Sequence, residues 1–191
     1  MATYAKGSVA RAGHEHIRKT FGDDVWKRAV DSLLPDESAT VRNLTDATPY
    51  PIAIDGKIFT FVCNDQFGGD PQRMGMSMRS MGAGQADEML NGIFSVFARF
   101  VSPQQAFSRA GSIISSAYTG VTHSTEPRED GRGGVLRMCG FGELSYGAAS
   151  ISGWIERALA RFGASNPRVV ERHYTNGVVA AEELVFDLTW D

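Results

Sequence analysis

The chain has 191 residues, 42% of them hydrophobic, which is the size of one domain with a single core. Its formal net charge of −3 gives no broad basic field and argues against a nucleic-acid partner. No run reaches the roughly 20 apolar residues of a membrane span, no apolar export signal opens the chain, and the two cysteines form no CxxC motif. We therefore expect one cytoplasmic domain, residues 1–191, without a membrane span.

The front of the chain predicts two helices. Apolar residues recur at steps of three and four between Val9 and Leu34, with an interruption at Gly22 and a stop at Pro35. The polar segment 36–51 that follows predicts a loop.

Segment 52–67 fits two structures. Its isoleucine, phenylalanine and valine content favours a strand, whereas Ile54, Ile58, Phe61 and Val62 also fit one face of a helix. The pattern alone leaves helix and strand open.

The middle of the chain predicts two more helices. Residues 85–100 have too many apolar positions for one exposed face and indicate a largely buried central helix. Ser102 and Pro103 then supply an N-cap and a first-turn proline for a helix that runs to about Tyr118.

The last third predicts a four-stranded antiparallel sheet, built from two hairpins with one helix between them. The first hairpin is "GVTHSTEPREDGRGGVLRMCGF", the helix ends at Gly163, and the second hairpin turns at or near Asn176-Gly177. The alternation of Leu184, Phe186, Leu188 and Trp190 with the residues between them indicates a half-buried last strand. Helices first and strands last predict an α+β fold with N-terminal helices followed by this sheet.

Four histidines are the candidate metal ligands. On a helix, His14 and His16 are about 200° apart and cannot hold one ion, so we expect surface or capping roles for both. His123 and His173 each stand on a predicted strand without a neighbouring cysteine or histidine. The spacing therefore predicts no metal site.

Four methionines lie close together in "MGMSMRSM", at Met74, Met76, Met78 and Met81. Their thioethers suit a soft ion such as Cu(I). Methionine also fills irregular gaps in a core or forms a pliable pocket wall, and this interpretation is favoured, although a soft metal remains open.

No catalytic motif is present. "GAGQAD" at 82–87 lacks the third glycine and the preceding strand of a dinucleotide fingerprint, and there is no GxSxG motif and no Walker lysine. The scattered histidines make no set with cysteine or serine, so we expect a protein that is not an enzyme.

The order of elements resembles that of one superfamily. "KGSVARAGHEHIRKTFGDDVWKRAVDSLLP" is similar to the "G…(helix)…FG…W…LP" opening of the haem-nitric-oxide domains and of a related myxobacterial family of unknown function. With "ELVFDLTWD" at the end, the whole chain resembles the fold shared by these domains, the four-vinyl-reductase sensor domains and the TRAPP vesicle-tethering subunits. The resemblance implies a helix for segment 52–67.

The ligand residues of these families do not carry over. Haem-nitric-oxide domains bind iron through a histidine in the helix before a proline, and here that helix reads "NGIFSVFARFVSP". Their Tyr-x-Ser-x-Arg porphyrin clamp falls near Tyr118, where Gly120 and Thr122 replace serine and arginine. The four-vinyl-reductase sensors commonly hold zinc with cysteines in the final hairpin, and "HYTNGVVAAEELVF" has none. We therefore expect no cofactor.

Relatives of this fold enclose an apolar cavity, so the resemblance implies a pocket for an apolar small molecule. The alternative for each candidate is a plain core position, because aromatic residues dominate cores. The residues that we expect to line such a pocket are Met89, Phe94, Phe97, Phe100, Phe107 and Trp154.

The leading hypothesis is a non-catalytic regulatory, adaptor or sensor domain that acts by contact with an unidentified protein partner. Relatives often pair through N-terminal helices, and a surplus apolar stripe predicts a homodimer with Ile17, Phe21, Val25 and Trp26 at its interface. The alternatives are a haem- or metal-dependent gas or redox sensor that uses His14, His16 or His123, and a small enzyme that shows no recognised motif.

Overall fold

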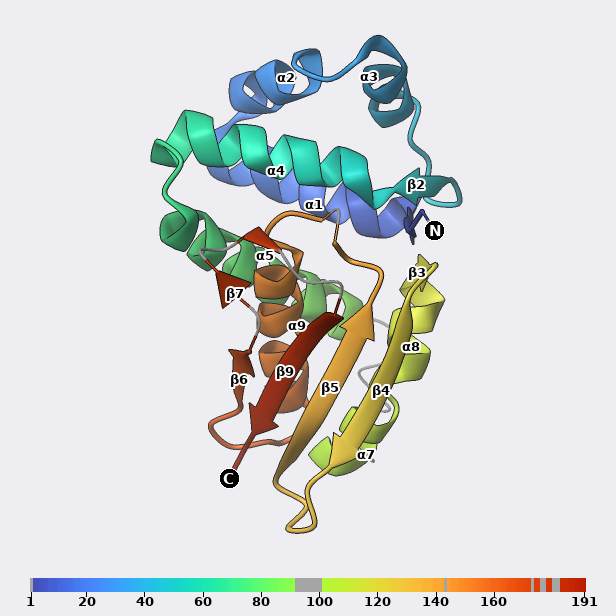
Figure 1. The fold of residues 1–191 in the computed structure, drawn as a ribbon, viewed down its shortest axis with the longest axis vertical. Helices are drawn as coiled ribbons and strands as arrows, with labels where there is room; N and C mark the ends of the chain where they lie inside the picture. The colour runs from blue at the N-terminus through green and yellow to red at the C-terminus, as the bar shows by residue number, and fades with distance from the viewer. Residues whose placement is uncertain (1, 92–100, 143, 173, 176–177, 180–182) are drawn as a thin grey trace.

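The computed structural model describes residues 2–91, 101–142, 144–172, 174–175, 178–179 and 183–191. Its helices are α1 (Gly7–Phe21), α2 (Asp23–Asp31), α3 (Pro35–Arg42), α4 (Ile52–Phe67), α5 (Pro71–Asn91), α7 (Pro103–Ser108), α8 (Ala110–Ala117) and α9 (Gly147–Arg161). Its strands are β1 (Tyr4–Lys6), β2 (Pro49–Pro51), β3 (Tyr118–Thr119), β4 (Thr122–Pro127), β5 (Gly133–Cys139), β6 (Arg168–Glu171), β7 (Tyr174–Thr175), β8 (Val178–Val179) and β9 (Glu183–Thr189). The predicted α+β fold is confirmed, and of the described helices all but α9 come before the strands of the four-stranded sheet β4-β5-β9-β6 (Figure 1).

The first four helices form a group at one end of the molecule (Figure 1). Gly22 separates α1 from α2, as predicted, at a φ of 93° that residues with a Cβ rarely adopt. The prediction of a loop over 36–51 is wrong at its start, where α3 forms. Only Ser38 and Val41 of α3 are buried, so the hydrophobic pattern gave little helical signal there.

Segment 52–67 is the helix α4, as the resemblance implied. Its buried residues are Ile52, Ile54, Asp55, Gly56, Ile58, Phe59, Val62 and Cys63. Because buried positions lie on most sides of the helix, its sequence shows no clean period of three to four residues.

The helix α5 begins well before the predicted start at residue 85, and residues 92–100 of that prediction lie outside the described residues. Met74, Met78 and Met81 are spaced to share one face of α5, and each is at most 4% exposed. Met76 is 74% exposed. Three of the four clustered methionines therefore fill the core, in agreement with the favoured interpretation.

The four-stranded antiparallel sheet has the order β4-β5-β9-β6, with α9 between β5 and β6 in the chain. The predicted alternation in the last strand is confirmed only in its second half, where Phe186 and Leu188 are at most 1% exposed and Asp187 is half-buried. Val185, on the face predicted to be the polar one, is only 2% exposed beside the buried Leu184. The helices α5 and α9 lie behind the four-stranded sheet in the view of Figure 1. The predicted turn at 176–177 lies outside the described residues, between the paired strands β7 and β8.

One predicted helix is divided in two, and one small sheet forms that was not predicted. Ser102 caps α7, since its hydroxyl accepts a hydrogen bond from the Gln105 amide at 3.2 Å, but the predicted helix to Tyr118 is divided into α7 and α8 at Arg109. A small sheet of order β2-β1-β3 was not predicted, because its strands have only two or three residues.

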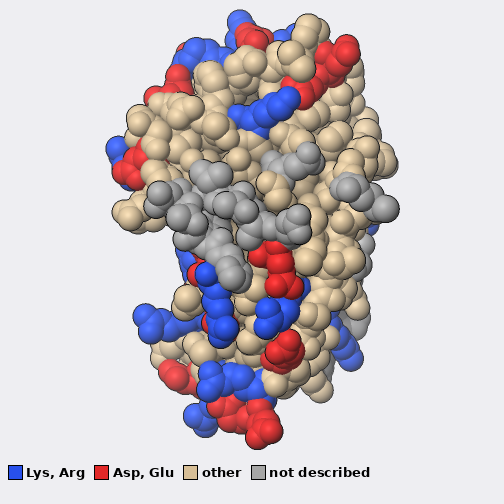
Figure 2. Space-filling model, in the orientation of Figure 1, with Lys and Arg blue, Asp and Glu red and all other residues tan. Residues whose placement is uncertain are grey.

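The opposite face of the four-stranded sheet bears charges of both signs. Arg137 forms ion pairs with Glu126 at 3.2 Å and with Glu183 at 3.6 Å, and Arg172 pairs with Asp187. Figure 2 shows basic side chains next to acidic ones over these strands. The described residues therefore give this face no extended field of one sign.

Candidate functional site

An apolar cavity of about 290 Å³ lies between α1, α5, α8, α9 and β5. Its lining consists of Ser8, Val9 and Ala12 from α1, Gln85, Glu88 and Met89 from α5, Ala110, Ile113, Ile114 and Ala117 from α8, Tyr118 from β3, Leu136 and Met138 from β5, and Ser150, Ile151, Trp154 and Ile155 from α9. Glu88 is the one ionisable acid or base among these side chains apart from the phenol of Tyr118. The described wall is thus mostly apolar, which is typical of a small-molecule pocket.

The α9 wall of the cavity is held against α5 at two glycines. A Cβ on Gly82 would lie 1.9 Å from the carbonyl oxygen of Ser150, and a Cβ on Gly153 would lie 1.9 Å from that of Arg79. Only residues without a side chain permit such close contact between two helix backbones. The position of α9 beside the cavity therefore depends on these two glycines.

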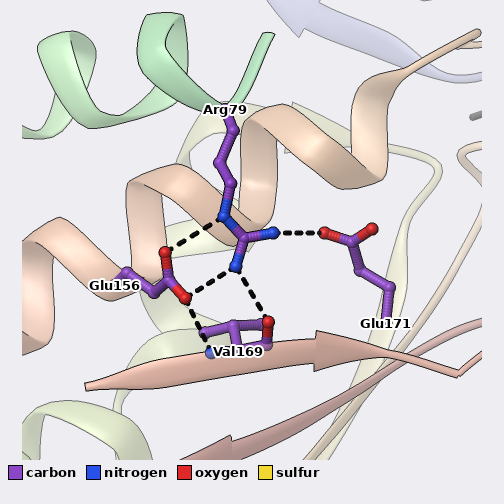
Figure 3. A network of polar contacts seen from close by, with 4 residues as sticks. All are labelled: Arg79, Glu156, Val169 and Glu171. Carbon is purple, nitrogen blue, oxygen red and sulfur yellow. Dashed lines mark hydrogen bonds and ion pairs between the residues drawn. The ribbon is translucent and has the colours of Figure 1, made fainter. Parts of the chain in front are cut away.

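The same contact is reinforced by Arg79, whose guanidinium lies between α9 and β6 (Figure 3). It donates to the two carboxylate oxygens of Glu156 at 2.6 and 3.1 Å, to Glu171 at 2.9 Å and to the carbonyl oxygen of Val169 at 2.8 Å. Glu156 also accepts the Val169 N–H at 2.8 Å. One side chain thus ties α5 to α9 and to the edge of the sheet.

The polar groups of the cavity are few. The ring of Tyr118 packs edge-on against Phe141 with 5.0 Å between ring centroids. Burial, together with the negative charge of Asp55, raises the pKa of Tyr118 to about 12. The phenol is therefore neutral at physiological pH, and the wall offers an uncharged hydroxyl among apolar groups.

The structure brings together two of the six predicted pocket residues. Met89 and Trp154 line the cavity, whereas Phe94, Phe97 and Phe100 lie outside the described residues. Phe107 is 2% exposed and lines a smaller neighbouring cavity of about 30 Å³.

Sequence reasoning missed most of the α8 wall. Ile113 and Ile114 lie in "GSIISSA", a short apolar stretch flanked by serines, and this pair was the available signal. Ala12 of α1 was also missed, because an alanine gives little indication that it borders empty space.

The four residues predicted at a dimer interface lie at least partly within the protomer. Ile17 is fully buried and Val25 is 6% exposed. Phe21 packs against Phe67 with 5.7 Å between ring centroids, and Trp26 is partly buried against the core. The stripe is thus mostly covered by the chain's own core, and it no longer supports the prediction of a homodimer.

The histidines are arranged differently from the prediction. His14 has no surface role: it is 5% exposed, and its Nε2 lies 2.8 Å from Oδ1 of Asp55. The Tyr50 hydroxyl donates to the same oxygen at 2.9 Å, and burial raises the pKa of Tyr50 far above its ordinary value. The pattern gave no sign of this cluster because Asp55 comes from the distant helix α4.

The other histidines do not join this cluster. His16 is half-buried on α1, His123 is exposed on β4, and His173 lies outside the described residues. The described residues contain no group of three or more histidine, cysteine, aspartate or glutamate side chains arranged to hold a metal ion.

Comparisons with protein families and with curated proteins find no match, whereas the comparison with solved structures finds proteins of similar fold. No protein-family model and no curated protein matches the chain, and among its described residues no helix has the length and apolar character needed to cross a bilayer. The Fe(II) unliganded H-NOX protein from K. algicida matches with a TM-score of 0.72 at 11% identity, over 97% of this chain and 96% of that one. The H-NOX protein from S. oneidensis, solved in the Fe(II)NO ligation state, matches with a TM-score of 0.67 at 13% identity, over 97% and 99%.

A Cs H-NOX mutant with an unnatural amino acid matches with a TM-score of 0.68 at 16% identity, over 97% of this chain and 96% of that one. Identities this low define a common architecture and leave ligands and partners undefined. The chain therefore has the fold of the H-NOX domains over nearly its whole length.

Proposed function

We propose that the chain is a non-catalytic sensor domain that holds a small apolar molecule in the cavity beside α9 and acts by contact with a protein partner. The observation that supports this most directly is the cavity of about 290 Å³, whose described wall includes one charged side chain. Burial of an apolar ligand there contributes about 25 cal/mol for each Å² removed from water. Localisation in the cytoplasm and a relationship to the myxobacterial family are further parts of the proposal.

The position of the cavity supports a sensing role. Its wall combines α1, from the helical end of the molecule, with α8, α9 and β5, from the part that contains the sheet. A ligand shifts a conformational equilibrium when it binds one arrangement of its wall more tightly than another. A molecule in this cavity contacts both parts of the fold and thus favours one arrangement of α1 against the sheet.

A haem-dependent gas sensor is the second candidate, and the similarity to H-NOX structures favours it. Several of these structures were solved in an Fe(II) state or were used to study haem distortion. Haem iron in proteins is held by histidine, cysteine, methionine or tyrosine. In this chain the described wall contains neither histidine nor cysteine, and the sequence of 92–100, "GIFSVFARF", contains none of the four.

The remaining donors suit haem poorly. Met89 and Met138 are thioethers without a histidine beside them, and Tyr118 stays protonated at neutral pH because its pKa is raised to about 12. No lysine or arginine belongs to the described wall, where porphyrin carboxylates need cations. The residues present therefore do not fit haem, and an apolar ligand without iron is the better match.

The test uses the apolar fluorescent probe N-phenyl-1-naphthylamine. We expect saturable binding by the wild-type protein and its loss in Ala12→Phe, because the added ring fills the cavity. Ala160→Phe is the matched control, since Ala160 is exposed on α9 and outside the cavity wall. Equal binding by the three proteins would refute the pocket.

A second arm tests haem directly. We expect no stoichiometric Soret band after incubation with haem. A band of full intensity that is lost on Tyr118→Phe, Met89→Leu or Met138→Leu would instead establish the haem sensor.

A further inference from the structure

A second, charged cleft of about 360 Å³ lies on a different side of α1, between α1, α2 and α3. It is lined by four basic side chains, those of Arg11, Arg18, Lys27 and Arg42. Two acidic side chains, Glu15 and Asp31, and an apolar wall that includes Trp26 complete most of the lining. The lining thus combines an excess of positive charge with an aromatic surface.

His14 is the buried polar group of this cleft. Its side chain is only 7% exposed, and the Trp26 ring lies 4.6 Å from it between centroids. Asp55 engages Nε2, and Tyr50 holds Asp55 in place. Among the described residues the ring is hydrogen-bonded at Nε2 only, and Nδ1 is not among the fully buried atoms without a partner, so the fixed ring has one nitrogen available to a ligand.

The basic side chains also have donors to spare. Arg11, Arg18 and Arg42 pair with Asp46, Asp23 and Asp31, and each of these ion pairs engages a single guanidinium nitrogen. A guanidinium has five N–H donors, so several remain for a ligand. The carboxylates of Asp46 and Asp23 are 68% and 73% exposed, where water and salt screen their charge.

Lys27 differs from the three arginines. It has no ion-pair partner among the described residues, although it lines the cleft on α2. An ammonium group without a partner in a cleft that also contains a fixed imidazole is suited to an anion.

We propose that this cleft binds a small organic anion, with its oxyanion group between His14 Nδ1 and Lys27 and its apolar part against Trp26. Hydrogen bonds from charged donors to an oxyanion are shorter and stronger than neutral ones. The aromatic surface favours an anion with a flat apolar body over inorganic phosphate alone. This site is separate from the apolar cavity and does not depend on the function proposed for it.

Oδ1 of Asp55 accepts a hydrogen bond from the Tyr50 hydroxyl and lies 2.8 Å from Nε2 of His14, so the orientation of the ring is fixed before a ligand binds. The charged and titratable groups around this ring are Arg11, Glu15 and Arg18 of α1, Lys27 and Asp31 of α2, Arg42 of α3, Tyr50 of β2 and Asp55 of α4.

The experiment is calorimetric titration of the full chain with phenyl phosphate at low ionic strength. We expect saturable binding, and an affinity about tenfold lower in Lys27→Met, the usual effect of losing a charged hydrogen bond. Lys19→Met is the matched control, since Lys19 is exposed on α1 and outside the cleft, and it should bind like the wild type.

His14→Gln should weaken binding; if this variant does not fold, the two lysine variants decide. Absence of binding, or equal weakening by Lys27→Met and Lys19→Met, would overturn the site. Equal affinity for inorganic phosphate would overturn the role of Trp26.

Discussion

The two sides of α9 are packed in opposite ways. On the side of Gly153 the helix backbone touches that of α5, with no room for a single added carbon. On the side of Ile151 and Trp154 the same helix faces a cavity of about 290 Å³. Protein interiors are normally filled to the density of organic crystals, so empty space persists where the surrounding structure cannot collapse into it. The close α5–α9 contact supplies this rigidity.

The first test of the comparison is Gly153→Ala, which should have the largest effect. A Cβ at 1.9 Å from the Arg79 carbonyl oxygen requires the helices to move apart, and overpacking of this kind costs about 3 kcal/mol. Urea unfolding measures the change. The matched control is Gly84→Ala, an exposed position of α5 with nothing within 4 Å of the added carbon, which should gain about 0.5–1 kcal/mol from helix propensity. Two variants of similar stability would show that the backbones are not in contact.

The second test is Arg79→Met, which removes the cation but keeps most of the apolar stem. Glu156 and Glu171 then lose their shared partner, and since Arg79 is about a third exposed we expect a loss of only about 1–2 kcal/mol. Arg157→Met is the control, because Arg157 joins the same two helices through Asp87 at a more exposed position. Equal losses in the two variants would mean that the network in Figure 3 is no stronger than a surface ion pair.

The third test should increase the free energy of unfolding, whereas the first should decrease it. Ala12→Leu adds three carbons on the cavity side of α1, and the added apolar burial should raise the free energy of unfolding by about 1 kcal/mol. The same thermal and urea measurements apply. A loss of stability would indicate that the cavity is already filled or that its wall collapses in solution.

The sequence predicted those parts of the fold whose signals are local. The break at Gly22 and the cap at Ser102 each depend on a few consecutive residues, and both are confirmed, as is the alternation from Phe186 to Trp190. The polar helix α3 was missed because its helical signal lies in a first-turn proline and acidic residues rather than in apolar spacing.

The sites were less predictable because they depend on contacts between residues that are far apart in the sequence. Gly82 was considered only as part of a dinucleotide fingerprint, and nothing near it in sequence indicates that it packs against Ser150. His14 was expected at the surface, because its buried partner Asp55 comes from a segment whose secondary structure the pattern left open. Aromatic content pointed to Trp154, which lines the cavity, whereas the alanines that border the cavity give no such signal.

The last prediction concerns the exclusion of water from the Tyr118 phenol in the cavity wall. Its effect on stability is the smallest at neutral pH. The phenol's folded pKa of about 12 lies above the ordinary value of 10, so between these pH values the unfolded chain releases the phenol proton while the folded chain keeps it. Stability from this group is therefore complete below about pH 10 and falls as pH rises towards about 12, by about 1.4 kcal/mol per pH unit at most. Tyr118→Phe should reduce this slope by one proton, although Tyr50 and Tyr146, whose pKa values are also raised, maintain part of it. Urea unfolding at several alkaline pH values measures both slopes. Parallel curves for the two proteins would mean that water reaches the phenol, and the cavity beside α9 would then be a hydrated groove rather than an apolar pocket.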